Sequence, residues 1–370
     1  MNSRERFRRT VRFQAVDRVP NIEVGCWSQT VPRWLREGMP TGTGLEESSM
    51  TFWSGSEFFG LDGQMVVPVG IQMIPGFESE LIEEDEHTVT YRSSEGIITR
   101  AMRDGSSMPT FLRYPVQNRE DFQAIKQRYD PTAPQRYPED WGDVMARSQA
   151  SELPVMTPAA GIGLYSMLRR WMGTENACTI FYDDPALAEE MIEFIVEFTI
   201  GLFDRVLREA QIDWYMWWED FAFKTGPLVS PRIFKRFLLK PYRRMNDFVR
   251  SHGIETIFID TDGDPRAVVP LLIESGINVL YPLEQCSEGM HPKHFREKYG
   301  QDLALWGGID KRALAHGKRE VEAELRSKLP GLVEQGGYIP QIDHLAPPDI
   351  PYENWLYYLE LKRKMLDLSS

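Results

Sequence analysis

The chain has 370 residues, of which 42% are hydrophobic and 26% are charged, an ordinary balance for a globular protein. Its formal net charge of -13 at pH 7 argues against a nucleic-acid-binding surface, which needs clustered Lys and Arg. No apolar run is long enough to predict a transmembrane helix, and the basic N-terminal segment lacks the apolar core of a secretory signal.

The cysteines are few and widely spaced. Cys26, Cys178 and Cys286 form no CxxC pair, which excludes a zinc ribbon and a thioredoxin-type site. A disulfide framework is not expected from this spacing. The cysteine usage therefore favours a reducing, cytoplasmic compartment.

In the N-terminal part of the chain, the apolar pattern predicts two helices and two strands. Residues 3–15 and 31–37 have helical patterns, whereas residues 19–27 and 64–70 are apolar runs that favour strands. Residues 119–150 predict further helices around a proline-rich stretch.

Residues 78–104 have a different character from the segments on either side. Within them, Thr88–Arg92 and residues 97–102 alternate between apolar and polar side chains, with a Ser-Glu-Gly turn between them. This pattern is typical of a β-hairpin. We expect the hairpin to be an insertion that decorates the main domain.

From about residue 154 onward, short apolar strands alternate with helices. Such repeated units predict a parallel sheet whose strands are covered on both faces. The predicted strands span residues 155–159, 213–218, 256–260, 277–283, 303–306 and 338–342, and the predicted helices span 161–172, 184–210, 230–252, 265–275, 291–299, 310–329 and 352–366.

Together with the two N-terminal strands, this count gives about eight strands, the number of a (β/α)8 TIM barrel. The expected fold is therefore an α/β barrel with an inserted hairpin and extra N-terminal helices, forming a single domain over residues 1–370. An open, doubly wound sheet is the alternative. It would require a Gly-rich GxGxxG or P-loop after an early strand, and neither motif is present.

Several segments resemble the uroporphyrinogen-decarboxylase-like superfamily. They are RERFRRTVRFQAVDRVPNIEV at the start, WWEDFAFKTGPLVSPRIFKRFLLKPYRRM in mid-chain, and IDTDGD, VLYPLEQ, WGGIDKRAL and YIPQIDHLAPPDIPYENW later. The resemblance runs across nearly the whole chain and is strongest after about residue 210. It implies a barrel fold, but the superfamily contains both porphyrinogen decarboxylases and zinc-dependent methyltransferases, so the fold alone does not assign a reaction.

Two motifs of that superfamily are altered here. The decarboxylases carry an arginine-rich MRQAGRYLPEY-like motif, whereas this chain has VGCWSQTVPRWLREG, with only Arg33 and Arg36 nearby. A substrate with eight carboxylates calls for many arginines. The methyltransferases carry a His-x-Cys pair where this chain has Asp260-Thr261-Asp262. The resemblance therefore implies a divergent member, not a typical porphyrinogen decarboxylase.

The acidic cluster after the strand TIFI is the first candidate site. Asp260 and Asp262 are two residues apart and can point the same way, towards the face on which barrel enzymes carry their chemistry. Two such close carboxylates require a proton, a cation or an arginine, and Arg266 is the candidate arginine. The structural alternative is that residues 262–264 form a turn and a helix cap.

Glu219 and Asp220 end the aromatic strand DWYMWW, and the resemblance to the superfamily implies that Glu219 is the inward-facing acid. Capping of a helix or an ion pair with Lys224 is the structural alternative. Among the aromatic residues of this strand, Trp217 is a candidate wall for a flat substrate, although core packing explains such residues equally well.

Three further residues lie where late strands meet their loops. His344 follows the last strand and is a natural acid, base or metal ligand, or else a structural histidine. Glu284 and Asp310 are candidate substrate-binding residues, and a helix cap is the alternative for Asp310.

These residues suggest a metal-assisted methyltransferase. Asp260, Asp262, Glu219 and His344 would hold a divalent metal, most simply zinc, acting as a Lewis acid on a small methoxy- or methylamine-type substrate. The methyl acceptor would be a separate corrinoid protein, since this chain has no DxHxxG motif with which to hold a corrinoid.

Two other functions stay open. In a carboxy-lyase without metal, acting on a small or tetrapyrrole carboxylate, Asp260 or Asp262 would stabilise or protonate an intermediate. In a non-catalytic ligand-binding barrel, an Asp260→Asn substitution would change no activity. The sequence also leaves open whether the chain forms a homodimer.

Overall fold

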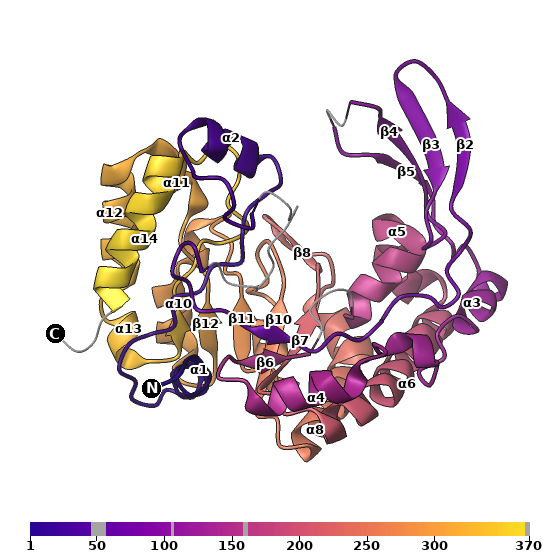
Figure 1. Cartoon of the computed structure of the whole chain (residues 1–370). Coiled ribbons are helices and arrows are strands. Elements are labelled where there is room, and N and C mark those ends of the chain that lie inside the picture. The colour runs from indigo at the N-terminus through magenta and orange to yellow at the C-terminus, as the bar shows by residue number, and fades with distance from the viewer. Residues whose placement is uncertain (46–56, 105–106, 158–161, 367–370) are drawn as a thin grey trace.

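The computed structural model describes residues 1–45, 57–104, 107–157 and 162–366. Its centre is a seven-stranded sheet that curls around an apolar interior, in the order β1-β6-β7-β10-β11-β12-β13 (Figure 1). Every neighbouring pair is parallel, as the repeated strand–helix pattern predicts. The strands are β1 (Met65–Val66), β6 (Val155–Met156), β7 (Trp214–Trp218), β10 (Thr256–Asp260), β11 (Val279–Tyr281), β12 (Ala304–Trp306) and β13 (Tyr338–Ile339).

The expected eighth strand, residues 19–27, is not a strand of the sheet, and its Cys26 instead forms an isolated parallel bridge with Ala346, beyond the end of β13. Pro20 has no N–H to donate, which weakens pairing at the start of this segment. The parallel curled sheet is therefore confirmed over the described ranges, whereas a closed (β/α)8 barrel is not. Residues 158–159 of the predicted strand 155–159 lie outside the described residues.

Alternation along β7 divides its side chains between two layers. Trp214 and Met216 face the interior of the curled sheet, where the Trp214 ring lies 5.6 Å from that of Trp306. Tyr215 and Trp217 face the surrounding helices instead. Every residue of β7 is large and apolar or aromatic, and both faces of the strand pack against other layers.

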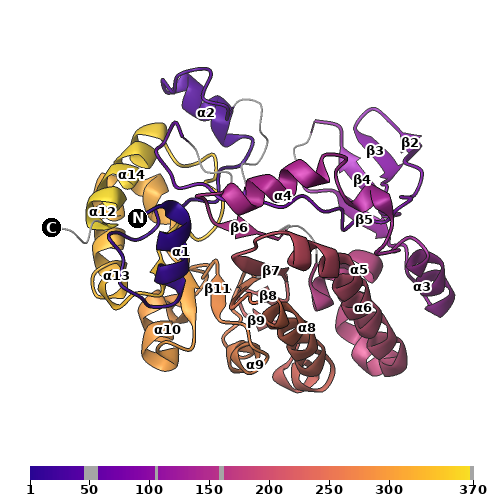
Figure 2. The same cartoon turned by 60° about the horizontal axis from the view of Figure 1, so that its bottom comes forward.

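Helix α1 (Ser3–Val11) closes the end of the sheet at which the strands begin, and Figure 2 shows it in front of that end. Its Phe7 ring lies 5.9 Å from Trp214 inside the sheet. Its Arg4 is ion-paired with the buried Asp213, immediately before β7. The predicted helix 3–15 ends earlier than expected because Phe13 adopts a left-handed conformation, with φ 57°.

The remaining helices surround the sheet, and none in the described ranges is long and apolar enough to cross a membrane. The predicted helix 310–329 is broken at Gly317 into two helices. The helices are α2 (Thr30–Arg36), α3 (Arg119–Lys126), α4 (Trp141–Ala150), α5 (Leu164–Asp183), α6 (Pro185–Glu209), α7 (Pro231–Ile233), α8 (Leu239–Ser251), α9 (Val269–Glu274), α10 (Pro292–Tyr299), α11 (Lys311–His316), α12 (Lys318–Lys328), α13 (Leu332–Gln335) and α14 (Tyr352–Leu366).

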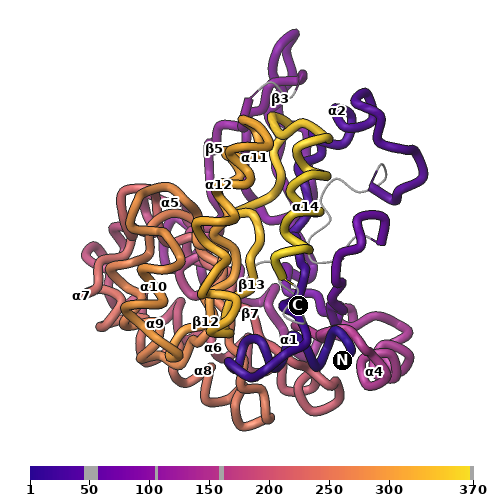
Figure 3. The backbone as a smooth tube through the Cα atoms, turned by 90° about the vertical axis from the view of Figure 1, so that its left-hand side faces the viewer, coloured from indigo at the N-terminus to yellow at the C-terminus, as the bar shows by residue number. Residues whose placement is uncertain are grey.

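The closing helix α14 lies beside the N-terminal segment, as Figure 3 shows. The rings of Trp34 and Trp355 stack at 5.3 Å. Beneath them, Lys362 of α14 forms a fully buried ion pair with Glu23. This contact joins the two ends of the chain at the point where the sheet has its weakest pairing.

The predicted hairpin is the centre of a larger sheet. β3 (Thr88–Arg92) and β4 (Ile98–Met102) pair antiparallel, as the alternation predicts, but β2 (Glu80–Glu84) and β5 (Thr110–Arg113) extend them to four strands. β2 and β5 are exposed along their whole length, so neither has the alternating pattern that marks a half-buried strand. Figure 1 shows this second sheet standing beyond α5.

Candidate active site

The polar residues predicted from the sequence follow the carboxyl ends of neighbouring parallel strands. These ends meet at one edge of the sheet, where enzymes with such folds carry their chemistry. The side chains that follow β7, β10, β11, β12 and β13 are Glu219, Asp220, Asp260, Asp262, Glu284, Asp310, Lys311, Asp343 and His344.

Asp262 and His344 are two predicted site residues whose side chains lie close together. Their Oδ2 and Nε2 atoms are 3.5 Å apart, and the side chains are 39% and 27% exposed. The His344 ring stacks on Trp27, with the ring planes 18° apart. This stacking explains the orientation of His344, and the sequence offered no signal for it.

The electrostatic surroundings of this pair bring it close to neutrality. Burial, followed by the charges of Asp220 and Glu284, raises the pKa of Asp262 to about 7. Burial and the nearby Lys311 lower the pKa of His344. At pH 7 Asp262 is therefore protonated in part of the molecules while His344 is mostly uncharged, which suits general acid–base chemistry.

Asp260 is a second acid with a raised pKa. Burial raises it first, and repulsion from Asp262 and Asp220 adds to the effect. The expected compensation by Arg266 is wrong. Arg266 instead makes a bidentate pair with Asp264, two residues away, at 2.8 and 2.5 Å. A proton, and not an arginine, thus relieves the repulsion between Asp260 and Asp262.

Lys311, which the sequence analysis did not single out, brings a positive charge to this cluster. Its Nζ lies 3.3 Å from Asp343 Oδ1 and 3.6 Å from Glu284 Oε1. Asp343 is buried and also accepts a hydrogen bond from the Gln285 backbone N–H, at 2.8 Å. The sequence placed Lys311 only in the first turn of the predicted helix 310–329, which gave no signal of this role.

The structure corrects the expected role of Glu219. Its carboxylate accepts the backbone N–H groups of Tyr165 (3.2 Å) and Ser166 (2.9 Å) at the start of α5, and also the Tyr242 hydroxyl. The side chain is fully buried, and burial raises its pKa to about 7. Glu219 therefore caps a helix from within the core and is not open to substrate.

Glu219→Gln is expected to lower the free energy of unfolding by about 2 kcal/mol, because its amide group leaves at least one buried donor of α5 without an acceptor. Urea unfolding at pH 8 measures this change. Glu334→Gln, at an exposed position, is the matched control and is expected to stay within about 0.5 kcal/mol of the parent. Equal stability of the two variants would remove the capping role from Glu219.

For Trp217 and Asp310 the structure shows the alternatives to substrate binding, which were core packing and a helix cap. Trp217 is completely buried, and its Nε1 donates to Asn246 in the helix layer, so it forms no wall of an open site. Asp310 caps α11 and pairs with Arg312 on both carboxylate oxygens. Glu284 stays at the edge of the acidic cluster, where it accepts the Gly263 N–H at 2.9 Å.

The expected zinc site does not fit this arrangement. Of the four expected ligands, Glu219 is occupied by α5 and Tyr242, while Asp260, Asp262 and His344 remain at the edge of the sheet. Within the described ranges, no three or more His, Cys, Asp or Glu side chains converge on a common metal position. The four residues therefore do not form one metal centre.

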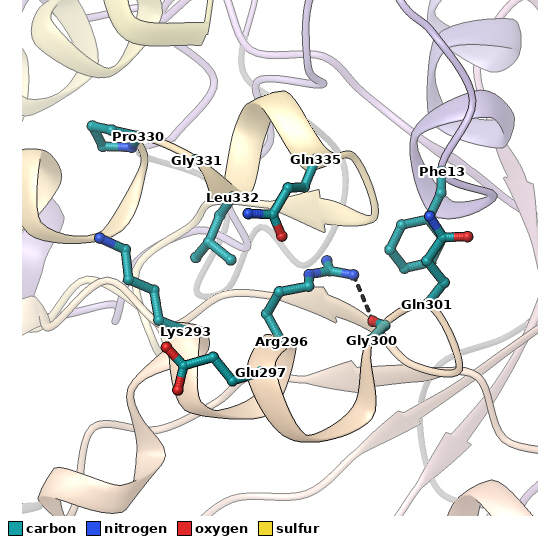
Figure 4. Close-up of a pocket in the computed structure, with 10 residues that line it drawn as sticks. All are labelled: Phe13, Lys293, Arg296, Glu297, Gly300, Gln301, Pro330, Gly331, Leu332 and Gln335. Atoms are coloured by element: carbon teal, nitrogen blue, oxygen red, sulfur yellow. Dashed lines mark hydrogen bonds between the residues drawn. The ribbon is translucent and has the colours of Figure 1, made fainter.

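A cavity of about 280 Å³ adjoins the acidic cluster, lined by Trp218 and Asp220 among others. A larger cavity, about 710 Å³, is shown in Figure 4. Its walls come from segments that precede β12 and β13, so it lies at the opposite end of the sheet. There Arg296 donates to the Gly300 carbonyl at 2.8 Å, a bond that holds the end of α10. The candidate active site is therefore the acidic cluster with its adjoining smaller cavity.

Removing the Asp262 charge is expected to stabilise the fold at high pH. A carboxyl whose pKa rises from 3.8 to about 7 on folding contributes stability below pH 4, and this is lost as the pH rises through 7. Histidines with lowered pKa values change the stability with pH in the opposite direction. The measurement therefore compares Asp262→Asn with the parent, because both proteins contain the same histidines.

The stability of Asp262→Asn relative to the parent is expected to rise by about 1 kcal/mol between pH 5 and pH 8, a value discounted for solvent screening of this partly exposed side chain. Urea unfolding at the two pH values measures it. A difference that does not change with pH would show that Asp262 is ionised normally.

Comparison with known proteins identifies the family and the fold. The uroporphyrinogen decarboxylase (URO-D) family model matches residues 99–365. No curated protein sequence matches the chain significantly. A solved methyltransferase from Methanosarcina mazei shares the fold, with a TM-score of 0.63 and 15% identity over 98% of this chain and 99% of that one.

A B12-independent methionine synthase from Shewanella sp. W3-18-1, solved in complex with selenomethionine, aligns with a TM-score of 0.38 and 13% identity over 61% of this chain and 67% of that one. This similarity is too low to support an argument. The family match, in contrast, covers well over half of the chain and includes every strand end that carries the acidic cluster. The chain therefore belongs to the uroporphyrinogen decarboxylase (URO-D) family.

Proposed function

We propose that this protein is an enzyme that protonates the leaving group during methyl transfer from a small methoxy- or methylamine-type substrate. The observation that carries the proposal is the Asp262–His344 pair, 3.5 Å apart, with the pKa of Asp262 raised to about 7. A group with such a pKa can hold a proton at neutral pH and still release it to a substrate.

In this reaction the bond between the methyl carbon and the substrate oxygen or nitrogen breaks. The methyl group passes to a strong nucleophile, which we propose is a corrinoid carried by a separate protein. The electron pair stays on the oxygen or nitrogen, and Asp262 gives that atom its proton. His344 then passes a proton from water back to Asp262, so the acid is restored.

The charge of the site supports a neutral or cationic substrate. The carboxylates of Asp220, Glu284 and Asp343 raise the pKa of Asp262, whereas the ammonium group of Lys311 lowers it. Negative groups thus outnumber positive ones among these neighbours. A polyanionic porphyrinogen would meet repulsion there. Glu219, one of the expected zinc ligands, is bound to α5. The acid is therefore assigned to a side chain of this protein.

Lys311 favours a second candidate, a carboxy-lyase acting on a small carboxylate. Its ammonium group bridges Glu284 and Asp343 at the edge of the cluster and is placed to attract a substrate carboxylate. After loss of carbon dioxide, Asp262 would protonate the carbanion that is left behind. The same acid thus serves both reactions, and the bond that breaks distinguishes them.

The test uses the purified chain with free, fully reduced cobalamin as the methyl acceptor. Methoxy compounds and methylamines labelled with ¹³C are offered in parallel with ¹³C-labelled small carboxylates. Labelled methylcobalamin supports methyl transfer, and labelled carbon dioxide supports the lyase. If neither product forms above the level of a His344→Gln variant, both enzymatic proposals are wrong and the ligand-binding alternative gains support.

A further inference from the structure

The cavity of about 710 Å³ lies at the end of the sheet opposite the acidic cluster, and we call it the basal cavity (Figure 4). Its walls come from α10, α13 and the segment after α1, and they include Phe13, Arg296, Leu332 and Gln335. Small-molecule sites in proteins have volumes of roughly 300 to 1,000 Å³. The basal cavity is therefore large enough for a small ligand, and the charges of its walls indicate which kind.

One wall of the basal cavity contains a buried cation. The Arg296 side chain, on α10, is only 8% exposed. It donates to the carbonyl oxygens of Gly300, Gly336 and Gly337, at 2.8, 2.9 and 2.9 Å. A guanidinium group has five N–H donors, and the Nε–H of Arg296 has no partner among the described residues. The three carbonyl groups position the guanidinium but do not neutralise its charge.

The guanidinium group is fixed in place by neighbours that carry no charge. It lies 4.5 Å from the centre of the Phe13 ring, and Phe13 itself has a left-handed backbone, with φ 57°. The ring in turn packs on Gly337, where a Cβ atom would lie 2.1 Å from it. Because Arg296 is already held in one position, an anion that binds to it need not pay for ordering the side chain.

The positive charge of Arg296 is not balanced within the described ranges. Burial lowers the pKa of Arg296 to about 10, and no carboxylate of the described residues acts in the opposite direction. Lys293 and Glu297, the other charged residues of the walls, have opposite signs, so Arg296 leaves the basal cavity with one positive charge in excess. A buried cation is costly unless an anion compensates it. A ligand with a single negative charge matches this excess, whereas a phosphate dianion exceeds it.

The wall opposite Arg296 combines apolar groups with one amide. Figure 4 shows the side chains of Leu332 and Gln335, both from α13, across the basal cavity from α10. Pro330, just before α13, adds a second apolar group to this wall. The Gln335 amide can donate a hydrogen bond to an anion. The walls therefore suit a molecule with an anionic end and a hydrocarbon body.

We propose that the basal cavity binds an organic monocarboxylate. The carboxylate faces Arg296 and Gln335, and the hydrocarbon body lies against Leu332 and the neighbouring proline. The site is at the end of the sheet opposite the acidic cluster, so binding requires neither of the proposed reactions, and failure of either reaction leaves this inference standing. The alternative is that Arg296 only ties the end of α10 to Gly336 and Gly337, and it predicts that no carboxylate binds.

Titration calorimetry on the full chain tests the chemistry of the site. The probes are octanoate, its uncharged analogue octanamide, and inorganic phosphate, which is an anion without a hydrocarbon body. We expect octanoate to bind at least about tenfold more tightly than either of the others, because only octanoate offers both a carboxylate to Arg296 and a chain that leaves water. Equal affinities of octanoate and octanamide, phosphate binding as tight as that of octanoate, or no binding of octanoate would each overturn the proposal.

Substitutions locate the ligand. Arg296→Met is expected to weaken octanoate binding by at least about tenfold, but it also removes three bonds to backbone carbonyls. Gln335→Trp leaves Arg296 intact and fills the basal cavity with an indole ring, so it keeps the test valid if Arg296→Met does not fold. It should cause a similar loss of affinity. Glu334→Trp is the matched control, because Glu334 is the adjacent exposed residue of α13 but does not line the cavity, and its affinity should stay unchanged. Unchanged affinity in Gln335→Trp, or an equal loss in both tryptophan variants, would reject the site.

Discussion

Replacing Asp262 with Asn is expected to lower kcat by a factor of about 10² to 10⁴, the usual contribution of a general acid. Asn has almost the same shape as Asp but has no proton to give at neutral pH. The carboxyl lies 3.5 Å from His344 and has its pKa raised to about 7. Steady-state kinetics on the substrate found by product analysis measure the loss.

The pH profile gives a second readout for the same acid. If Asp262 donates a proton, the parent rate falls as the pH rises above about 7, because the carboxyl is then ionised. The variant should lose this limb of the profile. Asp264→Asn is the matched control, because Asp264 is in the same loop but is paired with Arg266, and its kcat should stay within a few-fold of the parent. If Asp264→Asn is as slow as Asp262→Asn, the acid role is wrong.

Lys362→Met is expected to lower the free energy of unfolding by about 3 to 5 kcal/mol, because it leaves the Glu23 carboxylate buried without its counter-charge. Both side chains are fully buried, and Glu23 also accepts the Tyr358 hydroxyl at 2.6 Å and the Ile342 N–H at 3.2 Å. Burial raises the pKa of Glu23 and lowers that of Lys362, so each ion depends on the other for its charge.

Urea unfolding at pH 7 measures this loss. Lys364→Met is the matched control, since Lys364 is on the same helix but is 68% exposed and paired only with Glu360. It should change the free energy of unfolding by less than about 0.5 kcal/mol. The double variant Glu23→Leu/Lys362→Met should recover much of the loss, because no lone charge then remains buried. Equal stability of the Lys362→Met and Lys364→Met variants would contradict the prediction.

The sequence by itself determined the alternation of parallel strands with helices and the positions of Asp262 and His344 after the strands. Apolar runs buried on both faces are recognisable without a structure, and polar residues directly after them are brought to one edge by any parallel sheet. The antiparallel pairing of β3 with β4 was also predictable, because alternating side chains and a turn are local features of the sequence. The segments that resemble the uroporphyrinogen-decarboxylase-like superfamily indicate the same strand ends.

Only the tertiary structure decided which of these residues face the site. Glu219 lies one residue beyond β7, so its direction depends on the path of the loop, and that path brings it under α5. Trp217 and Trp218 are neighbouring residues of the same type. The alternation of β7 nevertheless buries Trp217 against Asn246, whereas Trp218 lines the cavity of about 280 Å³. Arg266 was expected beside Asp260 and Asp262, but the loop places it against Asp264.

The longest-range contacts had no signal in the sequence at all. Lys311, the cation of the acidic cluster, is defined by Asp343 and Glu284, which are 32 and 27 positions away. The pair of Glu23 and Lys362 joins residues 339 positions apart. Periodicity and capping rules report on neighbours within a few residues, whereas the partner of a charge is chosen by packing of whole elements. The sequence thus located the acids, and the fold chose their partners.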